Sequence, residues 1–126
     1  MDFFDLDECK HTFDVICLCL VVNFLGEPQR RGQMIAKAMR ILPLSGHLFL
    51  VLPLACVRNS RYFSQEMLVA MLKKLGGEVI EEYASPKLYF VMIRKVRERR
   101  EEEYTGCFPK LQILGGKGRN NFHIVL

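Results

Sequence analysis

Residues 11–25 have the sequence HTFDVICLCLVVNFL, and this stretch decides the fold class. An apolar run that is rich in Val and Leu and bounded by polar residues is typical of a strand covered on both faces, as in parallel α/β sheets. Ligands of such sheets bind just beyond the carboxyl ends of the strands. The sequence therefore predicts a fully buried strand over 11–25, with the first candidate functional residues, Asn23 and Phe24, at its end.

Length and composition limit the class of protein. The chain has 126 residues, of which 50% are hydrophobic, enough for the core of one domain. No continuous apolar run reaches the roughly 20 residues that a membrane span needs, because 26–28 and 53–61 contain Pro, Gly or charged residues. The acidic opening, residues 1–10, lacks the basic segment of a signal peptide. We therefore expect one intracellular domain that does not contact a membrane.

The cysteines give no sign of a disulfide framework or a zinc site, because their number is odd and no C-x-x-C pair occurs. They are Cys9, Cys17, Cys19, Cys56 and Cys107. Cys17 and Cys19 would share one face of a strand, which suits a metal or redox pair, but no further ligands have suitable spacing. We therefore predict reduced, mostly buried thiols and no bound metal.

The formal net charge of +4 conceals an asymmetry between the two ends of the sequence. Residues 1–14 carry five acids and one base, so the remaining chain carries 17 basic and 9 acidic residues. A basic body suits a polyanion such as RNA, which binds by phosphate neutralisation and counterion release. A set of ordinary solvated faces explains the charges equally well, since Arg97–Arg100 is followed at once by three glutamates.

Alternating strand and helix periods follow the first strand. Pro28 suits the first position of a helix, and Pro43, Ser45 and Gly46 end it. Its expected buried positions are Met34, Ile35, Ala38, Ile41 and Leu42. Its expected solvent-facing positions are Arg30, Arg31, Lys37 and Arg40.

The apolar run 47–54 predicts a second buried parallel strand, which Pro53 ends. Ser64 is a plausible N-cap for the next helix, and Gly76 and Gly77 end that helix. Its expected buried positions are Met67, Leu68, Met71, Leu72 and Leu75. Residues 78–96 then predict two strands around a Ser-Pro-Lys turn.

The resulting order β-α-β-α-β-β, ending in a hairpin, resembles the C-terminal half of a Rossmann-like class I S-adenosylmethionine-dependent methyltransferase. Five sequence blocks make the resemblance specific to the fungal large-subunit rRNA adenine-N1 methyltransferase family. These blocks are DFF, FDVICLCLVVNF, HLFLVLPLACVRNSRYF, SPKLYFVMIRK and RNNFHIVL. The resemblance implies S-adenosylmethionine as cofactor, ribosomal RNA of the pre-60S particle as partner, and a location in the nucleolus.

The resemblance also implies roles for individual residues. Asp2 and Phe3 resemble a cofactor-binding pair, with the carboxylate near the adenine amino group and the ring beside the adenine face. Asn23 and Phe24 occupy the position after the fourth strand where many nucleic-acid methyltransferases hold and stack the target base. The glycine-bearing loop and the acidic residue that family members have before this region, for the methionine end and the ribose of the cofactor, have no counterpart here.

The adenine N1 methylation that the resemblance implies needs little acid-base catalysis, because N1 already has a lone pair. The enzyme mainly holds N1 and the methyl group in line, about 3 to 3.5 Å apart. N1 is occupied by pairing in a duplex, so the base must be unpaired, stacked on an aromatic ring and bound at its Watson-Crick edge. We therefore assign Asn23 to base positioning and Phe24 to stacking. The alternative is that both residues only end a strand and fill the core.

Further candidates follow the second strand and occupy the C-terminal region. Asn59, Arg61 and Tyr62 have the polar and aromatic mix that suits a substrate phosphate or base, although a plain turn explains them equally well. The glycine-rich loop 115–119 lacks Walker spacing, so we expect no nucleotide hydrolysis. Residues 97–126 are expected to be a charged linker followed by a C-terminal strand or tail that could contact RNA.

In a complete class I methyltransferase fold the strands would lie across the sheet in the order 3-2-1-4-5-7-6. We expect this partial domain, residues 1–126, to keep the strands 4-5-7-6 of that order, all within 11–96. Right-handed crossovers place both helices on one face, which leaves the other face bare and one strand edge free for a partner. Three interpretations stay open. The chain is a truncated rRNA methyltransferase that is inactive alone, a non-enzymatic RNA- or protein-binding remnant, or a methyltransferase-like module that senses S-adenosylmethionine or acts on another substrate.

Overall fold

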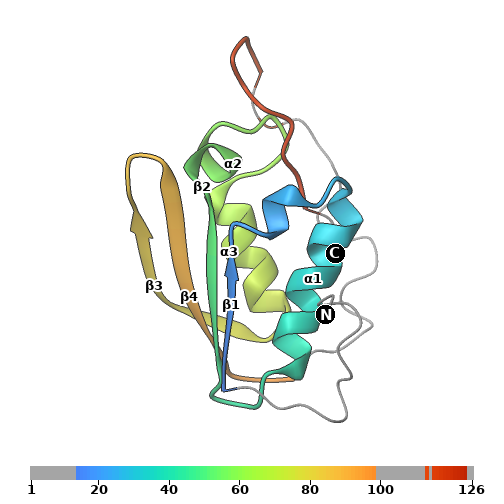
Figure 1. The fold of residues 1–126 in the computed structure, drawn as a ribbon, viewed down its shortest axis with the longest axis vertical. Coiled ribbons are helices and arrows are strands. Elements are labelled where there is room, and N and C mark those ends of the chain that lie inside the picture. The colour runs from blue at the N-terminus through green and yellow to red at the C-terminus, as the bar shows by residue number, and fades with distance from the viewer. Residues whose placement is uncertain (1–13, 99–112, 114, 125–126) are drawn as a thin grey trace.

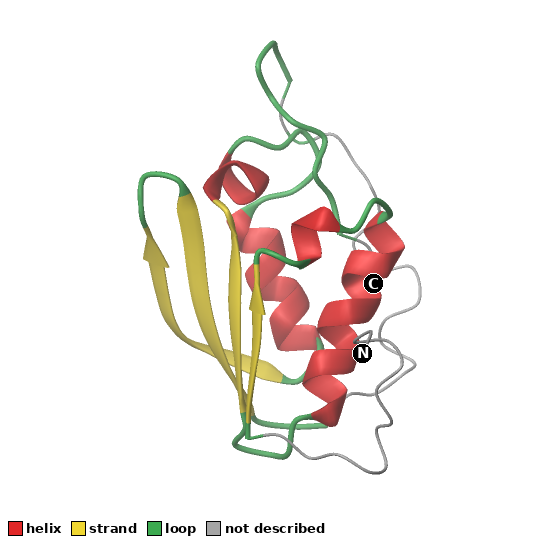
Figure 2. Cartoon of the chain, in the orientation of Figure 1, coloured by secondary structure: helices red, strands yellow, loops and turns green. Residues whose placement is uncertain are grey.

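The computed structural model describes residues 14–98, 113 and 115–124, so Asp2, Phe3, Cys9 and Cys107 lie outside the described residues. The described part folds as a mixed α/β layer with four strands (Figures 1 and 2). Its elements are β1 (Val15–Cys19), the 3-10 turn η2 (Val22–Phe24), α1 (Pro28–Ile41), β2 (His47–Pro53), α2 (Leu54–Arg58), α3 (Gln65–Lys74), β3 (Gly77–Ala84) and β4 (Leu88–Lys95). No helix within this part is long and apolar enough to pass through a bilayer.

The sheet has the order β1-β2-β4-β3. β1 and β2 are parallel, whereas β4 is antiparallel to both of its neighbours. Insertion of the last strand between β2 and β3 is the arrangement predicted as 4-5-7-6. The carboxyl ends of β1 and β2 therefore lie at one edge of the sheet, together with the turn between β3 and β4.

The first strand differs from the sequence prediction in both extent and burial. Within the described residues it covers only Val15–Cys19, because Leu20 adopts a left-handed backbone with φ of 58° and the chain then turns into η2. Leu18 is the only buried residue of β1, and Val15 is 55% exposed. The reason is that β1 is an edge strand with an uncovered face. Cys17 and Cys19 share this face and are exposed, so the prediction of mostly buried thiols is wrong for them.

Helix α1 begins at Pro28, as predicted, because proline fits the first helical position without losing a hydrogen bond. The helix is buried over more than one stripe, since every residue from Met34 to Met39 is buried. Lys37 is only 6% exposed, so its predicted solvent-facing position is wrong. A long aliphatic stem allows a lysine to be covered in this way.

The C-terminal end of α1 is tied to β4 by a buried lysine. Lys95 is 2% exposed, and its Nζ donates to Leu42 O at 2.7 Å and to Arg40 O at 3.3 Å. The same ammonium lies 3.0 Å from a carboxylate oxygen of Glu98. A cation is favourable at this point because the last carbonyls of a helix carry partial negative charge.

The caps and the hairpin agree with the sequence. Ser64 Oγ accepts a hydrogen bond from Met67 N at 3.2 Å and caps α3. Gly76 follows this helix with φ of 95°, a conformation that favours glycine. Residues 85–87 form the turn between β3 and β4.

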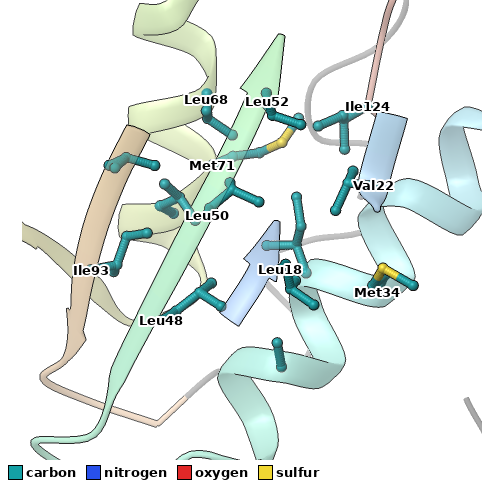
Figure 3. Close-up of a cluster of buried hydrophobic side chains, with 14 of the residues drawn as sticks. Leu18, Val22, Met34, Leu48, Leu50, Leu52, Leu68, Met71, Ile93 and Ile124 are labelled. Atoms are coloured by element: carbon teal, nitrogen blue, oxygen red, sulfur yellow. The ribbon is translucent and has the colours of Figure 1, made fainter. Parts of the chain in front are cut away.

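The two long helices lie on one side of the sheet, as predicted (Figures 1 and 2). Leu48, Leu50 and Leu52 of β2 point toward them and are completely buried (Figure 3). On the other side, Phe49 stacks on Phe90 with ring centroids 6.2 Å apart, but no helix or strand of the described part covers the pair. We call this uncovered side, with Val15, Cys17, Cys19, Phe49, Tyr83, Phe90 and Met92, the bare face.

Candidate functional site at the carboxyl edge of the sheet

Three segments that are distant in sequence meet at the carboxyl edge. They are the loop 20–25 after β1, the stretch 54–63 after β2, and residues 115–124, which we call the C-terminal segment. Asn120 N donates to Asn59 O at 2.9 Å, and Arg61 N donates to Asn120 O at 2.9 Å. These bonds form an isolated parallel bridge, and the described residues of the C-terminal segment contain no longer strand.

The C-terminal segment is anchored in the core. Phe122, His123 and Ile124 are buried, and Ile124 lies in the cluster that also contains Val22 of η2 (Figure 3). The Phe122 ring meets Phe63 edge to face at 5.5 Å. The buried Ser60 hydroxyl donates to Phe122 O. The segment therefore forms one wall of the carboxyl edge.

Asn23 and Phe24 lie in η2 directly beyond β1. Val22, which is fully buried, fixes this turn against the core. Phe24 is 81% exposed, the largest exposed fraction among the large hydrophobic residues in the described part. Asn23 Oδ1 is buried and has no hydrogen-bond partner within the described residues. The turn therefore exposes an aromatic ring and holds, in the preceding residue, a buried amide carbonyl that lacks a donor within the described residues.

Asn59 and Arg61 bind the C-terminal segment. Asn59 Nδ2 donates to Gly118 O at 2.8 Å. The Arg61 guanidinium donates to Arg119 O at 2.7 Å, to Asn121 Oδ1 at 2.8 Å and to Gly116 O at 3.0 Å. Both predicted substrate residues thus hold the glycine-rich loop in place.

Tyr62, the third predicted substrate residue, is half-buried. Its backbone carbonyl lies 3.1 Å from Nδ1 of the buried His123. The C-terminal segment therefore also contacts the chain directly beside Arg61.

Arg31 is the residue that the sequence analysis missed. Its Nε donates to Leu25 O at 2.9 Å, and its Nη1 donates to His123 O at 2.8 Å. The guanidinium also lies 4.5 Å above the centre of the Phe122 ring. Arg31 is half-buried rather than solvent-facing, and burial lowers its pKa, with the nearby Cys56 thiol acting in the opposite direction. Arg31 therefore joins the loop that carries Asn23 and Phe24 to the C-terminal segment.

No group of three or more His, Cys, Asp and Glu side chains that could hold a metal ion occurs within 14–98, 113 and 115–124. The site as described thus consists of an exposed ring, an amide and several arginines around a folded-in C-terminal segment. Asp2 and Phe3, predicted for the cofactor, lie outside the described residues.

The sheet order and the loops at its carboxyl edge define the later half of a class I methyltransferase fold. The chain resembles the crystal structure of N-methyltransferase NodS from Bradyrhizobium japonicum WM9, solved in complex with S-adenosyl-L-homocysteine, with a TM-score of 0.58. The match has 14% sequence identity and covers 77% of this chain and 53% of NodS, so it shows the fold alone.

A family model described as 25S rRNA (adenine(2142)-N(1))-methyltransferase, Bmt2, matches residues 1–124. The chain belongs to this family. It is 32% identical over 115 residues to the Saccharomyces cerevisiae 25S rRNA (adenine(2142)-N(1))-methyltransferase, covering 90% of this chain and 33% of that protein. It is 28% identical over 129 residues to the Schizosaccharomyces pombe 25S rRNA adenine-N(1) methyltransferase, covering 98% of this chain and 46% of that protein. The chain therefore spans less than half the length of either relative.

Proposed function

We propose that this chain is the base-binding half of an S-adenosylmethionine-dependent methyltransferase that modifies adenine N1 in large-subunit rRNA, and that it is inactive alone. The observation that carries the proposal is Phe24, which is 81% exposed beyond the carboxyl end of β1 and follows Asn23, whose buried amide carbonyl has no hydrogen-bond partner within the described residues. Covering such a ring is worth about 1.5–3 kcal/mol, so the exposed position suits a surface that a flat ligand covers. Unpaired RNA bases bind proteins by stacking on aromatic rings in this way.

In the proposed complex Phe24 stacks on the target adenine and Asn23 binds its Watson-Crick edge. The half-exposed Asn23 side chain would have to rotate so that its buried Oδ1 accepts a hydrogen bond from the N6 amino group. This bond satisfies a carbonyl that lacks a donor within the described residues. It also fixes the base so that the adjacent N1 lone pair faces the methyl donor.

S-adenosylmethionine supplies an activated methyl group when it is bound. We propose that Asp2 and Phe3 hold its adenine. Asn23 and Phe24 need only orient the acceptor base and exclude water, because N1 carries no proton that must be removed. Positioning of this kind accounts for a large part of the rate in reactions between two bound reactants.

We propose that Asn59, Arg61 and Tyr62 contact the RNA beside the target base. Within the described residues the hydrogen bonds of the Arg61 guanidinium go to the C-terminal segment, so the RNA would meet this arginine and the glycine-rich loop as one surface. Arginine, amide and aromatic groups are suited to phosphate contacts and stacking. The proposed partner is ribosomal RNA within the pre-60S particle, which implies a nucleolar location.

We propose that the preceding half of a methyltransferase domain covers the bare face and pairs with the free edge of β1. The strand has apolar or thiol side chains on both faces, which is typical of the interior of a parallel sheet. A free, flat apolar edge is otherwise a site of aggregation. A non-enzymatic remnant that binds a protein through this edge is the alternative, and the same bare face favours it.

The test replaces the matching region of the Saccharomyces cerevisiae relative with this chain and measures tritiated methyl transfer to large-subunit rRNA. We expect the chimera to be active, Asn23→Ala to lower kcat at least tenfold, and Phe24→Ala to raise KM for RNA. Gln33→Ala is the control, since Gln33 is exposed and lies outside both the site and the bare face.

Circular dichroism of each variant shows whether the fold is retained. Unchanged turnover in a folded Asn23→Ala chimera would remove its assigned role. A chimera that binds RNA and cofactor without methylation would favour the remnant. Methyl transfer by the 126-residue chain alone would contradict the proposed division of the active site, and calorimetry with S-adenosylmethionine tests cofactor binding by the chain directly.

A further inference from the structure

Residues of α2 and of the turn that joins β3 to β4 line a shallow groove. Both elements lie at the same edge of the sheet as η2 (Figure 1). Leu54 and Pro86 supply apolar surface in this groove, and Asn59 lies at one end of it. Leu54 N donates to Lys87 O at 2.8 Å, so the two walls are held together by a backbone hydrogen bond. The groove is therefore a fixed feature of the fold.

Two cations, Arg58 and Lys87, line the groove. Arg58 and Lys87 are both exposed, and neither side chain forms an ion pair or hydrogen bond within the described residues. Glu66 shares the neighbouring hollow with Arg58, but no ion pair forms between them. The groove thus offers two positive charges above an apolar floor.

The groove continues into the candidate site. Its Asn59 donates to Gly118 O, which places the exposed Lys117 and the rest of the glycine-rich loop next to the groove. Phosphates spaced along a nucleic-acid strand need separated cations, and ribose or base faces need apolar surface between them. An acidic peptide would match the charges but carries no ribose or base faces to cover the apolar residues between them.

We propose that this groove binds single-stranded RNA that flanks the target adenine, with Arg58 and Lys87 each neutralising one phosphate. The proposal rests on the proposed function, because it assigns the path of the same substrate. It does not depend on methyl transfer, so it can fail while the roles of Asn23 and Phe24 stand.

The test measures fluorescence anisotropy of a labelled 12-nucleotide single-stranded RNA with the 126-residue chain between 50 and 300 mM salt. Each single-strand phosphate contact contributes about 0.7 to the slope of log K against log salt. We expect Arg58→Ala and Lys87→Ala each to reduce the magnitude of this slope by about 0.7. The double variant should lower it by about 1.4, which is about 25-fold in affinity at 0.1 M salt if the curves meet at 1 M.

Lys73→Ala is the matched control, because Lys73 is an exposed cation in the last turn of α3, at the opposite edge of the sheet. We expect it to leave the slope unchanged, and thermal unfolding of all variants checks that the fold is retained. The proposal is overturned if the chain does not bind RNA, if the double variant keeps the parental slope, or if Lys73→Ala has the same effect. Equal displacement of the RNA by poly-L-glutamate would also overturn it, since the groove would then select acidic chains.

Discussion

Replacing Arg31 by Ala should destabilise the fold. The substitution leaves Leu25 O and His123 O without their donor, and it removes the cation above the Phe122 ring. A hydrogen bond from a charged donor contributes about 1.5–3 kcal/mol when buried, and a cation–π contact contributes about 0.5–1 kcal/mol when exposed. Because Arg31 is only half-buried, we take the lower values and expect a loss of about 2–4 kcal/mol.

Urea unfolding of the 126-residue chain, followed by circular dichroism, measures this loss. With a slope of about 2 kcal/mol per molar urea, the midpoint should fall by roughly 1–2 M. Arg31→Lys keeps the charge but loses the planar fork of the guanidinium. Its urea midpoint should therefore lie between those of the parent chain and of Arg31→Ala. Gln33→Ala is the control on the same helix and should change the midpoint little, because Gln33 is exposed. A loss below about 0.5 kcal/mol for Arg31→Ala would refute the conclusion that this side chain joins the loop to the C-terminal segment.

Two further substitutions test the packing and the thiols. Gly77→Ala should lower the free energy of unfolding, measured by thermal unfolding, by about 1–3 kcal/mol, because an added Cβ would lie 2.4 Å from Cγ2 of Ile93. Gly26→Ala should be nearly neutral, because Gly26 has open space around it. Equal effects of the two substitutions would contradict this packing. Burial raises the pKa of the Cys56 thiol, and the nearby Arg31 partly opposes this shift. In a variant with Cys56 as the sole cysteine, the thiol should therefore react slowly with Ellman's reagent at pH 8 and faster as the pH rises above 9. A variant with the exposed Cys17 as the sole cysteine should react faster at pH 8, and the reverse order would show that Cys56 is accessible.

The order of elements follows from local signals in the sequence. Pro28 begins α1, Ser64 caps α3, and Gly76 adopts the left-handed conformation that follows the helix. Each of these signals depends on the backbone conformation or hydrogen bonding of a single residue, so it can be recognised in the sequence without knowledge of the fold. The hairpin around residues 85–87 and the handedness of the crossovers then determine the sheet order.

Burial and long-range contacts could not be predicted in the same way. The apolar pattern of residues 15–19 suits a covered strand, but exposure depends on what stands beside it, and β1 lies at an edge. Arg31 lies 92 residues from His123 in sequence, so no local pattern shows that its guanidinium binds there. The sequence located Asn23 and Phe24 at the strand end but could not show that the Asn23 carbonyl lacks a donor within the described residues while the Phe24 ring is open to solvent.

Lys95 and Arg31 act at opposite ends of the same helix. α1 has 14 residues, which corresponds to a rod of about 21 Å. Lys95 fixes the C-terminal end of α1 to the sheet. A small change in helix tilt at that end would displace the N-terminal end, with Arg31 and the loop 20–25, by a larger distance. Substitutions around Leu42 should therefore alter the position of the Phe24 ring, which we propose stacks on the target base.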